Sequence, residues 1–241
     1  MTAPALLLLA HGTSDAAGRA TWERLLLAVR RALPGVEVRL AYADVVSPTM
    51  AEALAELPGP PDAPRGGAGP AVVIVPAFLA AGYHVRVDVP EQLAATGRTD
   101  VVVAEPFGPD PALVGVLLDR LEEAGAGPGD TVVLAAAGSR DPGAQEDLRT
   151  AAALLTARVG HEVPVGYVAG GEPRVASVVA SAAPRGQRVV LASWLLAPGA
   201  FHRWLADAGA AVVAEPLGDH PDVVGVAVAR YRAAVPAEVV P

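Results

Sequence analysis

The sequence predicts an α/β protein built from two tandem, doubly wound units, each with a four-stranded parallel sheet, and a cleft between the units. Three observations predict this class: a long internal repeat, short apolar runs that alternate with longer helical stretches, and strands that are apolar on both faces. The chain has 241 residues, of which 52% are hydrophobic and 18% charged. That length and composition allow one large domain or two small ones with a sizeable core.

The repeat is clearest towards the end of each half. The segment AEPFGPDPALVGVLLDRLEEA at 104–124 is answered by AEPLGDHPDVVGVAVARYRAA at 214–234. Working backwards, LLLLAHGTSD at 6–15 aligns with VVLAAAGSRD at 132–141. A match of this length indicates that the chain contains two copies of one unit.

Each unit reads as four strand–helix pairs. In the first half the expected strands are ALLLLA, VEVRLAY, AVVIVPAF and VVVAE, and a helical stretch follows each one. We expect units at 1–125 and 130–241, joined by the Gly-rich hinge 125–130, with the active site in the first unit and a degenerate copy in the second. The Pro/Gly-rich segment 58–70 accounts for most of the difference in length and is predicted to be a surface loop.

Composition excludes several classes of function. Because the chain has no cysteine, disulfides, thiolate metal sites and cysteine nucleophiles are excluded. The net charge is −8 and the eighteen basic residues, all Arg, form no run, which argues against a nucleic-acid partner. The apolar runs are shorter than the roughly 18 residues that span a bilayer, and the first residues lack the basic region of a signal peptide. We therefore expect a cytoplasmic protein without a membrane partner.

Three polar side chains follow the strands of the first half. His11 ends the first strand, Asp44 follows the second, and His84 lies in the loop after the third. Ligands of doubly wound sheets bind beyond the carboxyl ends of the strands, so these residues are expected to converge there. Two imidazoles and a carboxylate suit a divalent metal ion and are also proton acceptors near neutral pH. Taken singly, each residue is more often a cap or an ordinary hydrogen-bonding partner.

The second half provides an internal comparison. In the repeat alignment Ala137 stands for His11, Ala169 for Asp44 and Phe201 for His84. A copy that folds without the three polar side chains indicates that the fold does not require them, which favours a functional role. A shift of one residue would instead pair His202 with His84 and bring it to the cleft.

Further candidates surround this constellation. After His11, the segment GTSD is expected to turn at the glycine, with Thr13 and Ser14 capping the first helix and presenting backbone N–H groups to anionic ligands. A plain helix cap is an equally good interpretation of both residues. His161 lies in a turn at the opposite edge and His220 opens the last helix, so both are expected to be solvated.

The segments LLLLAHGTSD, ADVVSPTMAEAL and VPAFLAAGYHVRVDVPEQL resemble the signature segments of the sirohydrochlorin chelatase family, the class II chelatases of siroheme and cobalamin synthesis. The resemblance covers essentially the whole chain. Its most specific parts are AHGT and GYHVRVDVP, whereas the family often has Glu at the position of Asp44. It implies a chelatase-like fold and a lyase that inserts Fe²⁺ or Co²⁺ into a tetrapyrrole without ATP.

The resemblance also implies roles for individual residues. His11 and His84 are expected to deliver the metal and to accept the pyrrole protons, and Asp44 to balance the charge of the ion or to orient an imidazole. Thr13, Ser14 and Arg86 are expected to bind the carboxylates of the tetrapyrrole. No cofactor beyond the substrate metal is implied.

Several alternatives stay open at this point. Insertion of iron for siroheme is favoured, but cobalt insertion for cobalamin and a metal or tetrapyrrole carrier without turnover fit the same residues. An esterase or phosphatase that uses His11 would lack a GxSxG elbow or an adjacent nucleophile. Since one chain holds both units, we expect a monomer.

Overall fold

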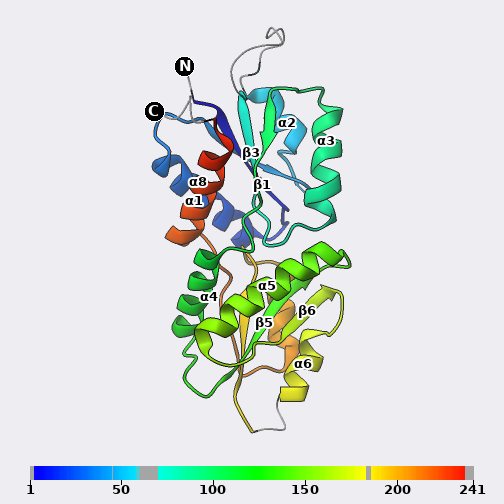
Figure 1. Cartoon of the computed structure of the whole chain (residues 1–241), viewed down its shortest axis with the longest axis vertical. Helices are drawn as coiled ribbons and strands as arrows, with labels where there is room; N and C mark the ends of the chain where they lie inside the picture. The colour runs from blue at the N-terminus through cyan, green and yellow to red at the C-terminus, as the bar shows by residue number, and fades with distance from the viewer. Residues whose placement is uncertain (1–2, 45, 58, 60–69, 183–185, 237–241) are drawn as a thin grey trace.

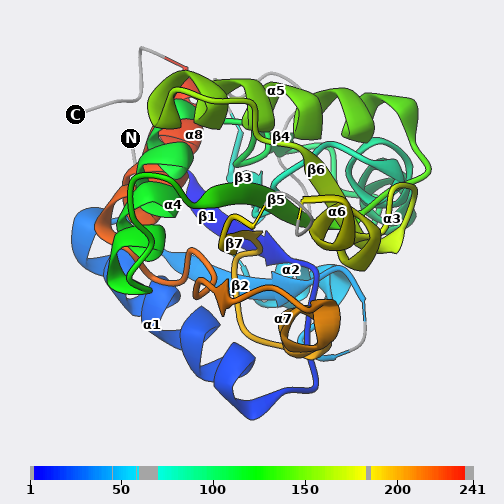
Figure 2. The same cartoon turned by 90° about the horizontal axis from the view of Figure 1, so that it is seen from below.

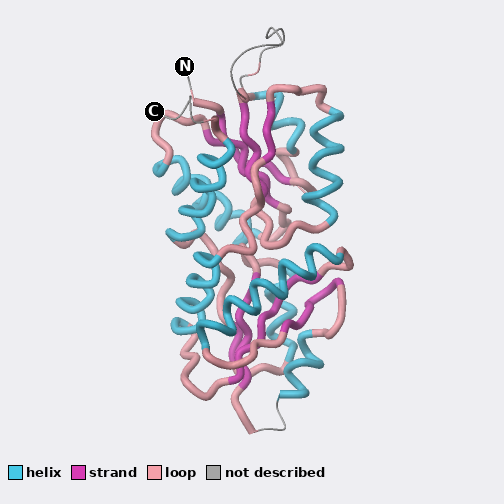
Figure 3. Tube along the Cα trace, viewed as in Figure 1, coloured by secondary structure: helices cyan, strands magenta, loops and turns pink. Residues whose placement is uncertain are grey.

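Figure 1 shows a computed structural model of the chain, which describes residues 3–44, 46–57, 59, 70–182 and 186–236. It contains two four-stranded parallel sheets with the strand orders β2-β1-β3-β4 and β6-β5-β7-β8. Both sheets therefore have the same topology, and the predicted α/β class with two parallel sheets is confirmed. Figure 3 shows the sheets one above the other along the long axis, each with helices around it. The loop predicted at 58–70 lies, apart from its residues 59 and 70, outside the described part of the chain.

The elements alternate between strand and helix along both halves. The strands are β1 (Ala5–Ala10), β2 (Val38–Tyr42), β3 (Val72–Pro76), β4 (Val101–Val103), β5 (Thr131–Gly138), β6 (Val165–Gly170), β7 (Val189–Trp194) and β8 (Val212–Val213). The α-helices are α1 (Ala16–Ala32), α2 (Met50–Glu56), α3 (Val89–Ala95), α4 (Pro111–Glu123), α5 (Pro142–Val159), α6 (Val175–Ala182), α7 (Ala200–Leu205) and α8 (Pro221–Ala234). A π-helical turn, η1 (His84–Asp88), precedes α3, and a 3-10 turn, η3 (Ala206–Ala208), follows α7. Among the described residues, none of these helices is both long and apolar enough to cross a membrane.

The central strand β1 is apolar on both faces because helices cover both faces of its sheet. The side chains of Leu6, Leu7, Leu8 and Leu9 are all fully buried. Leu6 and Leu8 belong to one hydrophobic cluster with α1 residues, whereas Leu7 and Leu9 join the cluster that contains α2 residues. Successive side chains of a strand point to opposite faces, so an unbroken apolar run fills two cores at once.

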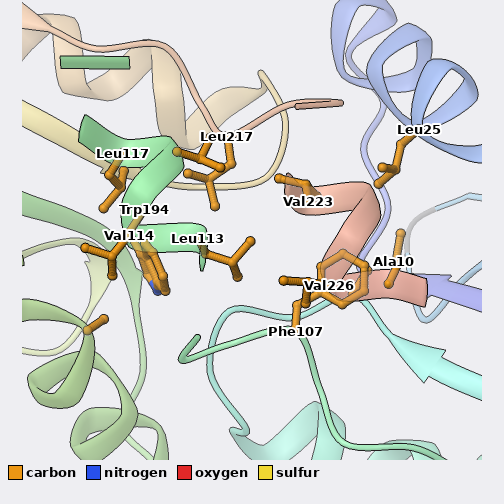
Figure 4. Close-up of a cluster of buried hydrophobic side chains, with 14 of the residues drawn as sticks. Ala10, Leu25, Phe107, Leu113, Val114, Leu117, Trp194, Leu217, Val223 and Val226 are labelled. Atoms are coloured by element: carbon orange, nitrogen blue, oxygen red, sulfur yellow. The ribbon is translucent and has the colours of Figure 1, made fainter. Parts of the chain in front are cut away.

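The last helix of each half packs on the sheet of the other half. Helix α4 follows β4 but contacts β7 and α5, and α8 follows β8 but contacts β3 and α1. Each sheet, together with the helices packed on it, forms one lobe. Figure 1 shows the exchange of helices, with α4 in the lower lobe, around the second sheet, and α8 beside α1 in the upper lobe, around the first sheet. The side chains drawn in Figure 4 show both contacts: those of α4 lie near Trp194 and Leu217, and those of α8 lie near Ala10 and Leu25. One hydrophobic cluster consequently runs through both lobes.

Two equivalent arginines fasten the exchanged helices. Arg120 of α4 donates from Nε to Pro216 O at 3.1 Å and from Nη2 to the next carbonyl along the chain. Arg230 of α8 donates in the same way to Pro106 O at 2.7 Å and to the carbonyl that follows it, and it pairs with Asp110 at 2.9 Å. The symmetry of these bonds confirms in three dimensions the repeat seen in the sequence. Viewed from below in Figure 2, α4 and α8 lie next to each other along one side of the molecule.

Candidate functional site

The end of β1 positions His11. The chain turns at Gly12, whose φ of 102° lies in the left-handed region that side chains other than glycine rarely adopt. A Cβ atom on Gly12 would collide with the carbonyl oxygen of Asp44, and the N–H of Asp44 donates to His11 O at 3.1 Å. The close approach of the two strand ends therefore places Asp44 beside His11, as the strand-end argument predicts.

His84 reaches the same place from the loop that follows β3. The centroids of the His84 and His11 rings are 5.0 Å apart, and the rings are tilted by 39°. His84 is the first residue of η1, and its Nδ1 lies 2.5 Å from Oδ2 of Asp88, one turn further on. Because a carboxylate accepts hydrogen bonds and cannot donate them when ionised, Nδ1 carries the proton in this pair. In the neutral form of the His84 ring, the Nε2 atom then keeps its lone pair, as a metal ligand or base requires.

His11 is held in a drier environment. Its Nδ1 is buried and has no hydrogen-bond partner. Among the buried side-chain nitrogen and oxygen atoms in the described part of the chain, it alone lacks one. Burial is the largest cause that lowers the pKa of His11 below its usual 6.5; the neighbouring His84 lowers it further, while Asp44 acts in the opposite direction. His11 is therefore neutral at pH 7 and can act as a ligand or accept a proton. A buried nitrogen without a partner calls for an explanation, and a role in binding or catalysis in the cleft would provide one.

A cleft between the lobes surrounds the two histidines. It has a volume of about 620 Å³, within the usual range of roughly 300–1,000 Å³ for small-molecule sites. Its walls are mostly apolar, and both lobes contribute the loops that follow their first and third strands. Phe78 lies next to His11, with ring centroids 6.2 Å apart, and Tyr83 is 58% exposed beside His84. Within the described residues, no group of three or more His, Cys, Asp or Glu side chains is arranged to hold a metal ion.

Thr13 and Ser14 both line the cleft, but their predicted capping role is wrong. Asp15 caps α1, because its carboxylate accepts hydrogen bonds from the backbone N–H groups of the first turn. Thr13 instead accepts a hydrogen bond from the N–H of Asp15 at 3.1 Å. A carboxylate competes well for the N-cap position since it also interacts favourably with the helix dipole.

Arg86 points towards the second lobe and is not among the residues that line the cleft. Its Nε donates to Ala81 O at 2.7 Å, and its Nη2 would lie 2.7 Å from a Cβ atom on Gly143 in the first turn of α5. Arg203, its counterpart in the repeat, also reaches across the lobes and forms an ion pair with Asp15. Each arginine thus contacts the other lobe, Arg86 by its approach to Gly143 and Arg203 by its ion pair.

The second half follows the register expected from the repeat. The N–H of Arg86 donates to Gly82 O at 3.0 Å, and that of Arg203 donates to Gly199 O at 3.1 Å. Two residues after these glycines stand His84 and Phe201, respectively. Ala137, Phe201 and His202 all line the cleft, and Nε2 of His202 lies 3.2 Å from Ala214 O. A Cβ atom on Gly138 would collide with the carbonyl oxygen of Gly170, one residue beyond Ala169, the counterpart of Asp44. The difference arises because the pairing of β5 with β6 contains a register shift there.

The remaining histidines lie away from the cleft. His161 is exposed in the turn after α5, and its Nδ1 lies 3.2 Å from Glu162 O. His220 is the N-cap of α8, where its Nδ1 accepts a hydrogen bond from the N–H of Asp222 at 3.2 Å. Neither residue is among those that line the cleft.

Asp88 and the second-lobe residues of the cleft were not predicted from the sequence. Asp88 stands four residues after His84, and on a helix this spacing brings two side chains together. That spacing could have predicted the contact, but the sequence assigns His84 to a loop, whereas the helical turn begins at His84 itself. Ser139 lines the cleft from the second lobe. It corresponds to Thr13 in the repeat, so the alignment of the two halves could have predicted it.

The lowered pKa of His11 predicts an acid-sensitive stability. Between the lowered folded-state pKa and the usual 6.5, the unfolded chain binds a proton at His11 and the folded chain does not. The His11 contribution is therefore fully present above 6.5 and is lost as the pH falls through the folded-state pKa. Urea unfolding from about pH 7.5 to about pH 5 should show a smaller loss of stability in His11→Ala than in the wild type. Parallel curves for the two proteins would contradict this assignment.

Fold and site together define the chain as a two-lobed α/β protein of the chelatase class, with a pair of histidines in the cleft between the lobes. The CbiX family model matches residues 5–124 and again 131–234, which cover most of the chain. The chain therefore belongs to the CbiX family of class II sirohydrochlorin chelatases.

Two curated relatives illustrate the similarity. A sirohydrochlorin ferrochelatase of Priestia megaterium is 31% identical over 111 residues, which are 43% of this chain and 42% of that protein. A sirohydrochlorin cobaltochelatase of Sulfolobus acidocaldarius is 30% identical over 124 residues, which are 49% of this chain and 90% of that protein. The first alignment thus spans less than half of the ferrochelatase.

Solved structures share the fold over almost the whole chain. SirB from Bacillus subtilis with Fe³⁺ superposes with a TM-score of 0.78 and 19% identity, over 98% of this chain and 97% of that one. CbiX, described as the terminal enzyme for biosynthesis of siroheme in denitrifying bacteria, superposes with a TM-score of 0.70 and 24% identity, over 96% of this chain and all of that one. At these identities the structures establish the common two-lobed architecture.

Proposed function

We propose that this protein inserts a divalent metal ion into sirohydrochlorin without ATP, with Fe²⁺ as the favoured ion for siroheme synthesis. The observation that carries the proposal is the pair of imidazoles, with ring centroids 5.0 Å apart, inside a cleft between two lobes. Family membership and the similarity to a protein named sirohydrochlorin ferrochelatase support the choice of reaction and of iron.

The two histidines have complementary tasks in this proposal. Metal insertion requires that the ion be brought to the macrocycle and that two pyrrole N–H protons leave. His84 is suited to hold the incoming ion through Nε2, because its Nδ1 is bound to Asp88. His11 is suited to accept a proton, because burial keeps it neutral at pH 7. Each imidazole is able to do both tasks. Because the two rings are in contact, the ion and the base lie next to each other.

Asp44 supports this pair through its charge. It is close enough to His11 to raise the pKa of that ring against the stronger effect of burial. In the proposed reaction it would stabilise the positive charge that arrives with the ion or with a pyrrole proton. Thr13 and Ser14, which line the cleft, are proposed to contact the carboxylates of the substrate. Arg86 is proposed for the same role and would have to turn away from the second lobe to fulfil it.

Cobalt insertion for cobalamin synthesis is the second candidate. It is favoured by the similarity to a protein named sirohydrochlorin cobaltochelatase, 90% of which is aligned. Imidazole nitrogen binds Fe²⁺ and Co²⁺ alike, and affinity along the first-row series does not by itself select between them.

Anaerobic incubation with sirohydrochlorin and Fe²⁺, Co²⁺ or Ni²⁺ in turn tests the proposal through the absorbance of the macrocycle. We expect catalysed insertion of Fe²⁺ and Co²⁺, with the larger kcat/KM for Fe²⁺. The number of metallated macrocycles per chain separates an enzyme, which exceeds one, from a carrier, which does not. A rate equal to that without protein for every ion would refute the proposed activity.

A further inference from the structure

The loop that carries His84 is held by the second lobe. The N–H of Ala81 donates to Oδ2 of Asp147 in α5 at 2.7 Å. Nε1 of Trp194, at the end of β7, donates to Leu79 O at 3.3 Å. A Cβ atom on Gly82 would lie 3.4 Å from both Ser139 Oγ and Ala144 Cβ, so the second lobe also packs closely against the loop.

This loop determines where His84 lies. The carbonyl of Gly82 accepts hydrogen bonds from the N–H groups of Val85 and Arg86, both at 3.0 Å, and these bonds start the helical turn η1. His84 is therefore two residues from the glycine that starts the turn and three from the N–H that Asp147 binds. Displacement of Ala81 would move the start of η1 and the imidazole with it.

The pseudosymmetry of the chain provides a matched comparison. The loop equivalent to 78–84 is 195–201, in which Pro198 takes the place of Ala81 and has no N–H to donate. Asp15 and Asp141 are the equivalent N-caps of α1 and α5. Six residues beyond these N-caps stand Thr21 and Asp147, respectively.

Thr21 does not take over the task of Asp147. Its Oγ1 donates to Ala17 O in its own helix at 3.0 Å. The carboxylate and the N–H are thus both present where the loop delivers a histidine, and both are replaced where the loop delivers Phe201. This asymmetry indicates that the bond serves the site rather than the general contact between the lobes.

We propose that Asp147 is a positioning residue: its carboxylate, supplied by the half of the chain that has no counterpart of His11 or His84, holds Ala81 so that His84 stays next to His11. The inference rests on the proposed function, since it assigns to His84 a task in metal delivery. It also gives the degenerate second lobe a role, namely that of holding the His84 loop of the first lobe in place.

The test compares three variants in rate, in metal affinity and in stability. Asp147→Ala removes the acceptor, whereas Asp147→Asn keeps an amide oxygen that can accept the same N–H. Asp219→Ala is the matched control: it removes a carboxylate that pairs with Arg24 across the lobes at 3.1 Å, away from the residues that line the cleft. The readouts are kcat and KM for Co²⁺ insertion into sirohydrochlorin, the calorimetric affinity for Co²⁺ alone, and Tm.

We expect Asp147→Ala to lower kcat and Co²⁺ affinity by about tenfold, because small displacements of a reacting group carry losses of this order. Asp147→Asn should restore both values to near those of the wild type, and Asp219→Ala should change neither. Unchanged values in Asp147→Ala, equal losses in the Asn and Ala variants, or an equal loss in Asp219→Ala would each overturn the proposal. If the wild type proves to lack chelatase activity, the Co²⁺ affinities of the variants still decide whether Asp147 positions His84.

Discussion

His11→Ala and His84→Ala are each expected to lower the turnover number for metal insertion by at least about 10²-fold, the loss typical of a missing acid–base group. The His11 variant loses the neutral, buried base, and the His84 variant loses the imidazole whose Nδ1 is fixed by Asp88. Both folds should survive, since the second lobe has Ala137 and Phe201 at the equivalent positions. Initial rates of Co²⁺ insertion and the Tm of each variant provide the measurement.

The other histidines supply the controls for this experiment. His161→Ala and His220→Ala should keep wild-type turnover because neither residue lines the cleft. Calorimetric titration with Co²⁺ should give one site per wild-type chain, and that site should be lost in His84→Ala. Near-normal turnover in either His11→Ala or His84→Ala would remove the mechanism. His202 borders the cleft with its Nε2 against Ala214 O, so a loss in His202→Ala as large as that in His84→Ala would add it to the site.

The fold was predictable because two independent features of the sequence agreed, namely the apolar strand runs and the internal repeat. The apolar run of β1 predicts a strand covered on both faces, and the two faces of that strand do fill different clusters. The repeat then extends the same topology to the second half. What the pattern does not specify is which sheet each helix covers. Helix α4 follows β4 in the sequence but packs near Trp194 and Leu217, on the sheet of the second half.

The site was predictable where backbone topology determines it. Parallel strands end at one edge, so His11 and Asp44 had to be neighbours, and the structure places them so. The contact between His84 and His11 depends instead on the course of a loop, which the sequence pattern leaves open. The N-cap of α1 is Asp15 rather than Thr13 or Ser14, because its carboxylate also interacts favourably with the helix dipole, whereas all three residue types are good caps in a sequence. The bond between Asp147 and Ala81 joins residues 66 positions apart and has no signature in a single sequence.

Substitution of the glycine in the turn after β1 is expected to have a second large effect. Gly12 is followed by the cleft residue Thr13 and preceded by His11, and its φ is 102°. Gly138 is its counterpart at the end of β5, with a φ of 95°. A Cβ atom at either position would collide with a carbonyl oxygen of the next strand end, from Asp44 or from Gly170. The two glycines thus have the same backbone requirement in two chemically different surroundings.

Gly12→Ala and Gly138→Ala should each lower the free energy of unfolding by about 3 kcal/mol, the sum expected from a strained φ and a displaced neighbour. Their effects on turnover should differ. In Gly12→Ala the displaced chain carries His11 and Asp44, and a shift of about 1 Å in such groups costs on the order of 10²-fold in rate. In Gly138→Ala the displaced chain carries Ala137, so turnover should fall far less. Urea unfolding and initial rates on the same preparations measure both quantities. Equal losses of turnover in the two variants would mean that the rate follows overall stability and not the position of His11 and Asp44.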